Sequence, residues 1–501
     1  MSVTTQHADF VAKLSQWQKV RDVCAGQDAV KAGKTKYLPR PNPGDSSNEA
    51  SVRYDNYLLR AVYVNFTGRT LSGLVGLAYA AWPDVEKASA LDYLDDNADG
   101  AGVSLIGQSQ VALAEVLKCG RAGLLVDYPA VDAPVSKAEQ SAGKVQATLT
   151  LYRAEDVINW RTTKVNGHSV LSLVVISEVV EVADGFKTAA VQKYRVLRLG
   201  ALDDPDPANV YSVEVWHKPD KDWVIESARV PLNSSGAPWA EIPFRFVGSV
   251  NNDTNVDPAP LYDMAELNLA HYRNSADYEE SVFLIGQPQL WMAGLTEHWR
   301  DHIEKTGVYL GSRSPLLLPE SGSAGLLQAS PNGLVGQAMR DKETQLAGLG
   351  ARLLTPGEAV KTAEQSRAET KAAHSVLSLA CDNVSEAYSR ALVWAGEFMG
   401  AESEASFAIG TDFAGLTVDA TVITAIVQAM QAGKLPDADG WAVLRKLGLI
   451  DADKSDEAIR EEIAASGAGL GLDDAGPGLP PPKKTTTIRR NADGSMTASE
   501  E

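Results

Sequence analysis

The sequence has few cysteines and no long apolar run. Its three cysteines, Cys24, Cys119 and Cys381, lie far apart and form no CxxC pair. This usage argues against a disulfide or zinc framework and is typical of a reducing cytoplasm. No apolar stretch reaches the roughly 18 residues of a membrane-spanning helix. No basic region followed by an apolar one opens the chain, so we expect neither a membrane segment nor a signal peptide.

Positive charge is also scarce. Lysine and arginine number 46 against 65 aspartates and glutamates, which gives a formal net charge of −19. The longest basic runs are the pairs Lys483-Lys484 and Arg489-Arg490. Since proteins that grip DNA by its phosphates carry a basic surface, tight DNA binding is not expected. A surface that DNA slides past without sticking remains open, because like charges repel.

Phosphate-cradling loops are absent as well. The sequence contains no GxxxxGK[ST], and no GxGxxG stands between a predicted strand and a predicted helix. The chain is therefore not expected to be a motor ATPase or a dinucleotide enzyme. With 44% hydrophobic and 22% charged residues, the composition is that of a globular protein. A chain of this length is expected to hold roughly two to four domains.

The spacing of apolar residues changes along the chain. Helical spacing predominates up to the predicted helix Val103–Lys118, after which Gly120 is a typical helix end. From Gln146 to Phe246 the pattern has a period of two, and Asp184-Gly185 is a hairpin signal. Helices followed by an antiparallel sheet predict an α+β fold.

The stretch Asp257 to Phe398 organises the rest of the chain. A predicted helix, Pro258–Phe283, opens with prolines, which are tolerated in a first turn. After an insert, a second predicted helix spans Leu334–Leu354, and Thr355-Pro356-Gly357 breaks it. Helical spacing resumes over Glu358–Met399, a run of roughly 60 Å at 1.5 Å per residue. Such helices usually line or brace an assembly, although an ordinary large helical domain is the alternative.

Two sets of polar residues could form a metal-binding or an acid/base site. His298 and His302 have the i, i+4 spacing that can place two imidazoles on one helix face for a metal. No general-base glutamate completes an HExxH motif, so surface histidines are the better interpretation. Arg121, Asp127 and Glu155 flank a predicted strand and could form an acid/base set, but ion pairs at a domain seam are the simpler interpretation.

Several motifs, in their order along the chain, resemble those of tailed-bacteriophage portal proteins. The resemblance spans roughly Tyr37 to Ile463. The similar motifs are structural ones: Gly120–Pro129, Tyr152–Glu155 with Asn159-Trp160, Ile242-Pro243-Phe244 and, most closely, Pro260 through Asn274-Ser275-Ala276-Asp277 to Gly286-Gln287-Pro288.

The resemblance implies a portal-type subunit of α+β class. Its parts would be a helical and β wing, two long stem helices, a small α/β clip between them, a tunnel loop that faces the channel, a helical crown and a disordered C-terminal tail. The implied bounds are 1–256 for the wing, 257–283 for stem helix 1, 284–333 for the clip, 334–354 for stem helix 2, 355–400 for the tunnel loop and long wing helix, 401–470 for the crown and 471–501 for the tail.

By the same resemblance the chain is a structural protein without catalytic residues, metal or cofactor. A ring, expected to be a dodecamer, would sit at one capsid vertex of the virion after assembly in the host bacterial cytoplasm. It would form the channel for packaging and ejecting double-stranded DNA, with transient contact that reads no sequence. The implied partners are the terminase large subunit, the head–tail adaptor and the major capsid and scaffolding proteins, with no membrane. The alternative is a cytoplasmic oligomeric metal-dependent hydrolase that uses His298 and His302.

The resemblance also implies roles for particular residues. Each is a position in the implied clip, stem or tunnel loop. The candidates are Trp291, Trp299 and Arg300 for the clip surface that faces terminase, Arg340 and Lys342 for the stem, and Lys361, Thr362, Gln365 and Arg367 for the tunnel loop that faces DNA.

Replacing both Lys361 and Arg367 with alanine tests the tunnel loop. We expect normal rings and normal incorporation into capsids, but less retained genome or slower packaging, because these cations would guide passing phosphates. The measurement is virion DNA content and titre, with Glu364→Ala as the control. Normal packaging in the double variant would show that these residues do not face the DNA.

Overall fold

The computed structural model describes residues 2–129, 145–165, 167–200, 210–286, 289–308, 317–327, 333–354, 375–401, 404–411, 413, 441, 454–458, 486–490 and 496–500. Met1–Phe413 and Ala414–Glu501 are two separate compact units. The first unit combines helices with antiparallel sheets, which confirms the predicted α+β class. None of the described helices combines the length and apolar character needed to cross a bilayer.

The N-terminal helices begin where the sequence supplies a capping side chain. Ser47, Asn65 and Ser104 each accept a backbone N–H of the following first turn, which satisfies a donor that a helix start otherwise leaves unpaired. The helices of this layer are α1 (Ala8–Ala25), α2 (Gln27–Ala32), α3 (Asn48–Arg60), α4 (Phe66–Ala78) and α5 (Leu105–Cys119), with short 3-10 turns at Lys34–Lys36 and Ser89–Asp95.

Two sheets follow the helices. In the first, β2 (Arg121–Asp127) lies between β3 (Thr148–Arg153) and β9 (Phe244–Gly248), and it is almost wholly buried. The second is a meander in the order β4-β5-β6-β7-β8, and its hairpin between β5 and β6 turns at Gly185, as predicted. The strands of this meander are β4 (Val157–Val165), β5 (His168–Asp184), β6 (Lys187–Leu199), β7 (Tyr211–His217) and β8 (Val224–Arg229).

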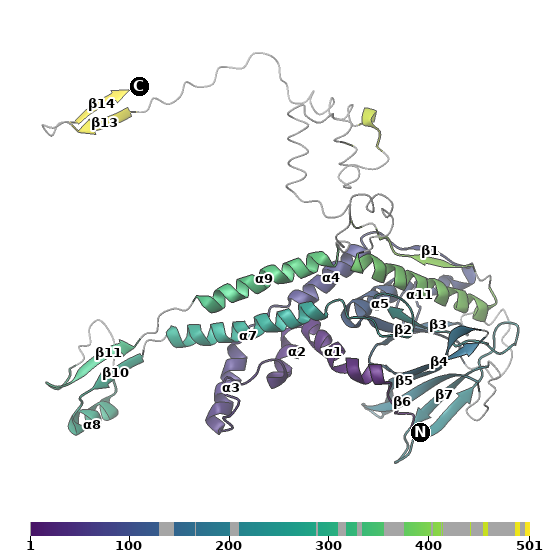
Figure 1. The fold of residues 1–501 in the computed structure, drawn as a ribbon, viewed down its shortest axis with the longest axis horizontal. Coiled ribbons are helices and arrows are strands. Elements are labelled where there is room, and N and C mark those ends of the chain that lie inside the picture. Colours follow the sequence, from purple (N-terminus) through teal and green to yellow (C-terminus); the bar gives the residue numbers. More distant parts are fainter. Residues whose placement is uncertain are drawn as a thin grey trace. The chain divides into compact units, whose positions relative to one another are not determined.

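The central stretch forms a helical hairpin, α7 (Tyr262–Ile285) and α9 (Leu334–Arg352), which lie side by side (Figure 1). The first helix begins at Tyr262 rather than at the expected Pro258, because both prolines lie in the irregular segment that leads into it. Between the two helices lie β10 (Gln289–Ala293), α8 (Glu297–Thr306) and β11 (Ser323–Leu327). The third helix, α11, is described over Val376–Met399, while the expected start at Glu358 lies outside the described residues.

In the C-terminal part, the expected disorder of the tail is wrong where the structure describes it, while most of the expected crown lies outside the described residues. The region expected to be a helical crown begins with a strand, β12 (Ser406–Ala408), which pairs with β1 (Asp84–Glu86) and places Phe407 in the core. The tail expected to be disordered contains a hairpin of β13 (Thr486–Arg490) and β14 (Met496–Glu500). The β-branched run Thr486-Thr487-Ile488 favours a strand, a local signal that the polar composition of the tail obscured.

Substituting Gly120 with alanine should destabilise the first unit. Gly120 has φ of 71°, and a Cβ there would lie 2.5 Å from the carbonyl oxygen of Pro258. The left-handed backbone and the clash together predict a loss of about 2–5 kcal/mol in the free energy of unfolding. Urea denaturation measures it.

Gly348→Ala is the matched control for this substitution. Gly348 lies within α9, and nothing comes within 4 Å of an added Cβ. An alanine in the middle of a helix should stabilise by about 0.5–1 kcal/mol. Equal effects at the two glycines would contradict the role assigned to Gly120.

Candidate functional site

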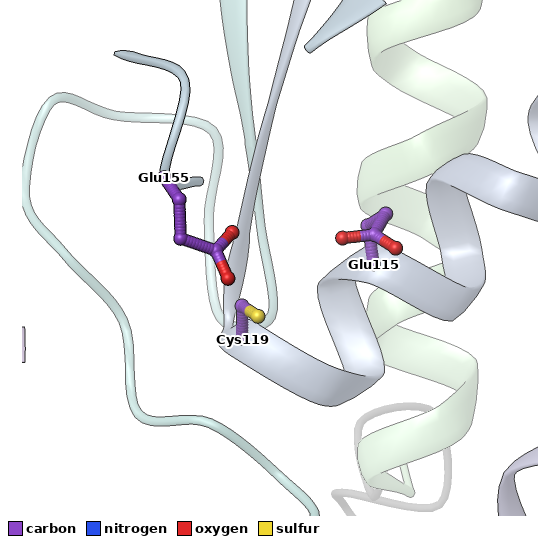
Figure 2. Close-up of side chains that lie close together, drawn as sticks. All are labelled: Glu115, Cys119 and Glu155. Carbon is purple, nitrogen blue, oxygen red and sulfur yellow. The ribbon is translucent and has the colours of Figure 1, made fainter. Parts of the chain in front are cut away.

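The described part of the chain contains one group of side chains with the donor types of a metal site. Glu115 and Cys119 lie one turn apart on α5, and Glu155 lies in the turn between β3 and β4 (Figure 2). One ligand atom from each lies within 4.8 Å of the others. Two carboxylates and a thiol at this spacing are a donor set that a divalent cation could use.

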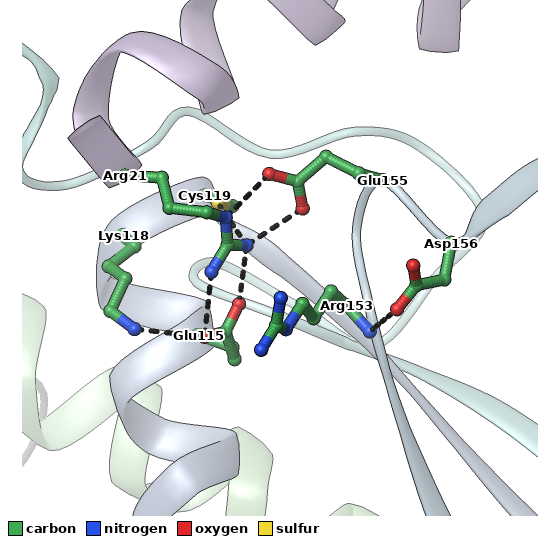
Figure 3. A network of polar contacts seen from close by, with 7 residues as sticks. All are labelled: Arg21, Glu115, Lys118, Cys119, Arg153, Glu155 and Asp156. Carbon is green, nitrogen blue, oxygen red and sulfur yellow. Dashed lines mark hydrogen bonds and ion pairs between the residues drawn. The ribbon is translucent and has the colours of Figure 1, made fainter. Parts of the chain in front are cut away.

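A guanidinium occupies this position instead. Arg21 of α1 donates from Nε to Glu155 Oε1 at 2.8 Å, and from Nη1 and Nη2 to the two oxygens of Glu115 at 3.1 and 2.7 Å (Figure 3). Nη2 also donates to Glu155 Oε2 at 2.8 Å and lies 3.7 Å from the Cys119 sulfur. The bidentate geometry on both carboxylates is that of a structural ion pair network, and it supplies the cation from the protein itself.

The ionisation of this network follows its burial and its charges. Burial alone would raise the pKa of the Glu115 carboxyl, but hydrogen bonds and charge from Arg21, with Lys118 adding to both, lower it overall. Burial raises the pKa of the Cys119 thiol well above its usual range. A neutral thiol is a poor metal ligand and a poor nucleophile. The network therefore ties α1, α5 and the β3–β4 turn together rather than performing chemistry.

The set formed by Arg121, Asp127 and Glu155 does not assemble into one acid/base site. Asp127 accepts from Arg195 at 2.8 Å and from Arg229 at 2.7 Å, while Glu155 pairs with Arg21. The interpretation of these two carboxylates as ion-pair partners is confirmed.

Arg121 makes contacts that the sequence did not indicate. Its guanidinium is buried against the rings of Trp160 and Phe246, 4.2 and 3.4 Å from their centroids. It donates to the carbonyl oxygens of Thr254 and Asn255, which holds the loop before α7. Burial lowers the pKa of Arg121 to about 9 despite nearby acidic groups. Among the described residues it has no carboxylate within ion-pair distance, so the expected seam ion pair is wrong for Arg121.

The hairpin of α7 and α9 is an antiparallel pair with a regular register. An added Cβ at Gly350 would lie 3.6 Å from Met264, and one at Gly336 would lie 3.6 Å from Tyr278. Midway between these contacts, His271 Nε2 lies 3.2 Å from a carboxylate oxygen of α9. The contacts are seven residues apart on both helices, which is close to two turns, so one stripe of each helix faces the other.

The end of this hairpin and the insert beyond it carry many large apolar side chains in contact with solvent. We call them the insert surface. Its members are Val282, Phe283, Leu284, Trp291, Leu317, Leu326, Leu327 and Leu334, each between 44% and 70% exposed. Isolated exposed apolar residues are ordinary, but a concentration of them on one projecting element marks an interaction site.

The structure describes some of the predicted site residues but not others. Trp291 lies on β10 and is 46% exposed, while Trp299 and Arg300 lie on α8, where the tryptophan is half-buried and the arginine is exposed. Arg340 is exposed and Lys342 half-buried on α9. Lys361, Thr362, Gln365 and Arg367 lie outside the described residues.

The two candidate metal ligands on α8 stay isolated. His298 and His302 are both exposed, and the ring of His302 contacts Trp299 edge-on with centroids 5.9 Å apart. No third ligand joins them among the residues that the structure describes.

The Arg21 network was not found from the sequence, because Arg21, Glu115 and Glu155 lie far apart along the chain and no motif links them.

Comparison with known proteins gives a partial family match and two similar folds. A family model described as "Domain of unknown function (DUF4055)" matches residues 260–399, less than half of the chain. No curated protein matches. The chain is similar to a chain of the "Virion of native gene transfer agent (GTA) particle" at 15% identity and a TM-score of 0.37, over 81% of this chain and 94% of that one.

A second solved structure is similar to the same extent. It is a chain of the "Neck of empty GTA particle computed with C6 symmetry", with 16% identity and a TM-score of 0.36. The match covers 85% of this chain and 98% of that one. At 15% and 16% identity and TM-scores of 0.37 and 0.36, these two similarities carry no argument about function, which therefore has to come from the residues of this chain.

Replacing Arg21 with methionine should leave Glu115 and Glu155, 5% and 17% exposed, facing each other with only Lys118, which pairs with Glu115 Oε1 at 2.9 Å, to offset their charge. Breaking a buried pair in this way costs about 3–5 kcal/mol at pH 7. Because the folded pKa of Glu115 is lowered, its stabilisation is present above the unfolded pKa and is lost as the pH falls through the folded pKa. The deficit of the variant should therefore shrink toward acid pH.

The measurement is urea unfolding of both proteins at pH 7 and near pH 4. Lys36→Met is the control, because Lys36 pairs with Asp22 at 3.3 Å on the surface and should contribute less than about 1 kcal/mol. A loss of the same size at both pH values, or one no larger than that of the control, would count against the assigned role.

Proposed function

We propose that this chain is the subunit of a bacteriophage portal, a ring at one capsid vertex that forms the channel for double-stranded DNA. The observation that carries the proposal is the antiparallel pair of α7 and α9, with an insert at its far end that exposes a concentrated apolar surface. The motifs Gly120–Pro129 and Pro260–Pro288, which resemble those of portal proteins, support it independently. In this proposal α7 and α9 are the stem and the segment between them is the clip.

The burial of α9 supports a role in assembly. Within its span only Leu346 is buried, so most other side chains of the helix are at least partly exposed in the part of the chain that the structure describes. The 24 residues of α7 extend about 36 Å, long enough to form the wall of a channel. In a ring, the uncovered faces of α9 would meet the stem of the neighbouring subunit or the channel.

The charges of the chain suit a channel that does not retain its cargo. The formal net charge of −19 repels the phosphate backbone of DNA. The basic residues of α9 are Arg340, Lys342 and Arg352, and no two of them are three or four residues apart, so no continuous basic stripe forms on that helix. Transient contact would come from single cations, including Lys361 and Arg367 of the proposed tunnel loop, and would read no base sequence.

The insert is the proposed docking element. Strands β10 and β11 pair only with each other among the described residues, so each has an outer edge available for a strand from a neighbouring chain. Trp291 of β10, with Trp299 and Arg300 of α8, would present the surface for the terminase large subunit and later for the head–tail adaptor. The N-terminal unit would contact the major capsid and scaffolding proteins within the virion. The subunit has no catalytic role in this proposal, and the terminase ATPase supplies the packaging energy.

Electron microscopy of negatively stained protein, together with native mass spectrometry, tests the proposal. The purified full-length chain should form closed rings, expected to be dodecamers, with a central hole and no bound zinc. It should hydrolyse no ATP. A small oligomer with stoichiometric zinc would instead favour the hydrolase that uses His298 and His302, and a motor-like ATPase turnover would exclude the portal.

Replacing residues 287–332 with a short Gly/Ser linker should leave a folded subunit that forms no stable rings. No described residue of the insert belongs to the main buried core, so the circular dichroism and the thermal unfolding midpoint should stay close to those of the full chain. Ring formation should fail because the part of the insert surface formed by Trp291, Leu317, Leu326 and Leu327 is gone, together with the edges of β10 and β11. Replacing the exposed turn 218–222 with a linker of the same kind is the control. Intact rings from the shortened insert would disprove its role.

A further inference from the structure

Helices α4, α7, α9 and α11 meet where α9 ends and α11 begins (Figure 1). The N–H of Leu377 on α11 donates to the carbonyl oxygen of Leu353, directly after α9, at 3.2 Å. An added Cβ at Gly350 on α9 would lie 3.6 Å from Thr70 on α4 and 3.6 Å from Met264 on α7. We call this place the α9–α11 junction.

The α9–α11 junction is built from stretches that carry almost no charge. Residues 61–83, which contain α4, include a single charged residue, Arg69. Residues 344–354, at the end of α9, include only Arg352, and residues 375–381, at the start of α11, include none. The two arginines are therefore the charges that these three stretches bring to the junction, in a chain where acidic residues outnumber basic ones by 65 to 46.

Both arginines are free to bind an outside group. The side chains of Arg69 and Arg352 are exposed, and neither forms an ion pair with a described residue. Arg21 and Arg195, by contrast, each join two carboxylates within the subunit. The start of α7 contributes one exposed carboxylate, Asp263, so the local balance is positive. Positive charge without partners in its own subunit suits a polyanion.

The outer face of α4 leaves room beside Arg69. Ser72, Gly73 and Gly76 follow this arginine at helical spacing, and all of them are exposed. An added Cβ at either glycine would meet nothing within 4 Å. A face without bulky or acidic side chains allows a broad, negatively charged partner such as duplex DNA to come close to the guanidinium.

We infer that Arg69 and Arg352 contact the phosphate backbone of duplex DNA in the channel. The inference rests on the proposed portal, and it adds contacts from α4 and α9 to those expected of Lys361 and Arg367. A ring presents each arginine once per subunit, so single weak contacts around the duplex add up to a transient hold. Contacts to phosphates carry no base sequence information, so the hold is the same along the whole genome.

Binding of duplex DNA to purified rings of the full-length protein tests the contact. Titration of a short fluorescent duplex at several salt concentrations gives the affinity and its salt dependence. Arg69→Ala combined with Arg352→Ala should weaken binding at low salt by at least roughly ten-fold and make the salt dependence shallower, because fewer counterions are released. Lys218→Ala combined with Lys221→Ala is the control of equal charge, since both lysines are exposed in the turn between β7 and β8. It should change the affinity much less.

Conservative variants separate the charge of these residues from a structural role. Arg69→Lys combined with Arg352→Lys should retain most of the affinity, because lysine binds phosphate as a point charge. Negatively stained images should show normal rings for the alanine and the lysine variants alike, because both arginine side chains are exposed and unpaired within the described part of the subunit.

The outcomes separate this inference from the proposed function. Unmodified rings that bind no duplex at low salt, or whose binding survives both alanine substitutions, would overturn the inference and leave the portal proposal standing. An equal loss in the lysine control would attribute binding to net charge alone, and lysine variants as weak as the alanine variants would exclude a simple phosphate contact. Loss of rings in the double alanine variant would place the arginines between subunits, which also overturns the inference. An unmodified chain that forms no rings would overturn both proposals.

Discussion

The packing of α11 is the constraint on which the rest of the first unit depends. This helix buries side chains on most of its length and contacts α5, β2 and β9 together. Two buried polar contacts fix its position: Asn383 Nδ2 donates to the carbonyl oxygen of Gly248, and Tyr388 donates to Gln108 Oε1. Buried hydrogen bonds of this kind are costly to leave unmade, so they select one alignment of the helix over the sheet.

The start of α7 is fixed in a similar way, whereas its end exposes apolar side chains. Asn268 accepts from the backbone and the hydroxyl of Thr67 and from Tyr63, and donates to the carbonyl oxygen of Val64. Both the oxygen and the nitrogen of the buried Asn268 amide therefore bond to α4 or to the segment before it. Beyond Tyr278 the helix exposes Val282, Phe283 and Leu284. A firmly held root with an apolar end suits an element that acts outside its own subunit.

The charged residues divide into two kinds. Buried or half-buried arginines such as Arg21 and Arg195 each join carboxylates from separate elements, and these pairs hold the layers in place. The remaining charges lie on the surface and give the chain its acidic balance. The acidic balance follows from composition, with 46 lysines and arginines against 65 aspartates and glutamates.

The arrangement of the first unit could largely be predicted from the sequence. Local signals determined that Leu105–Cys119 is a helix ending at Gly120, that a strand follows it, and that β5 and β6 turn at Gly185. Apolar periodicity also located α7 and α9, although Leu346 alone is buried among the described residues of α9, and α7 begins later than expected because proline constrains only its own neighbourhood. The tunnel-loop residues Lys361, Thr362, Gln365 and Arg367 lie outside what the structure describes and stay predictions.

What the sequence by itself determined was therefore local: caps, turns, strand alternation, helical stripes, the acidic balance and the absence of a phosphate loop. The tertiary structure alone decided which charges meet. Arg21 reaches Glu115 and Glu155 across 94 and 134 residues of chain, and the same group that resembles a metal site is thereby occupied by a guanidinium. It also decided that Arg121 lies against two rings instead of pairing with a carboxylate. Contacts between distant segments depend on how layers pack, and no pattern within a short window records that packing.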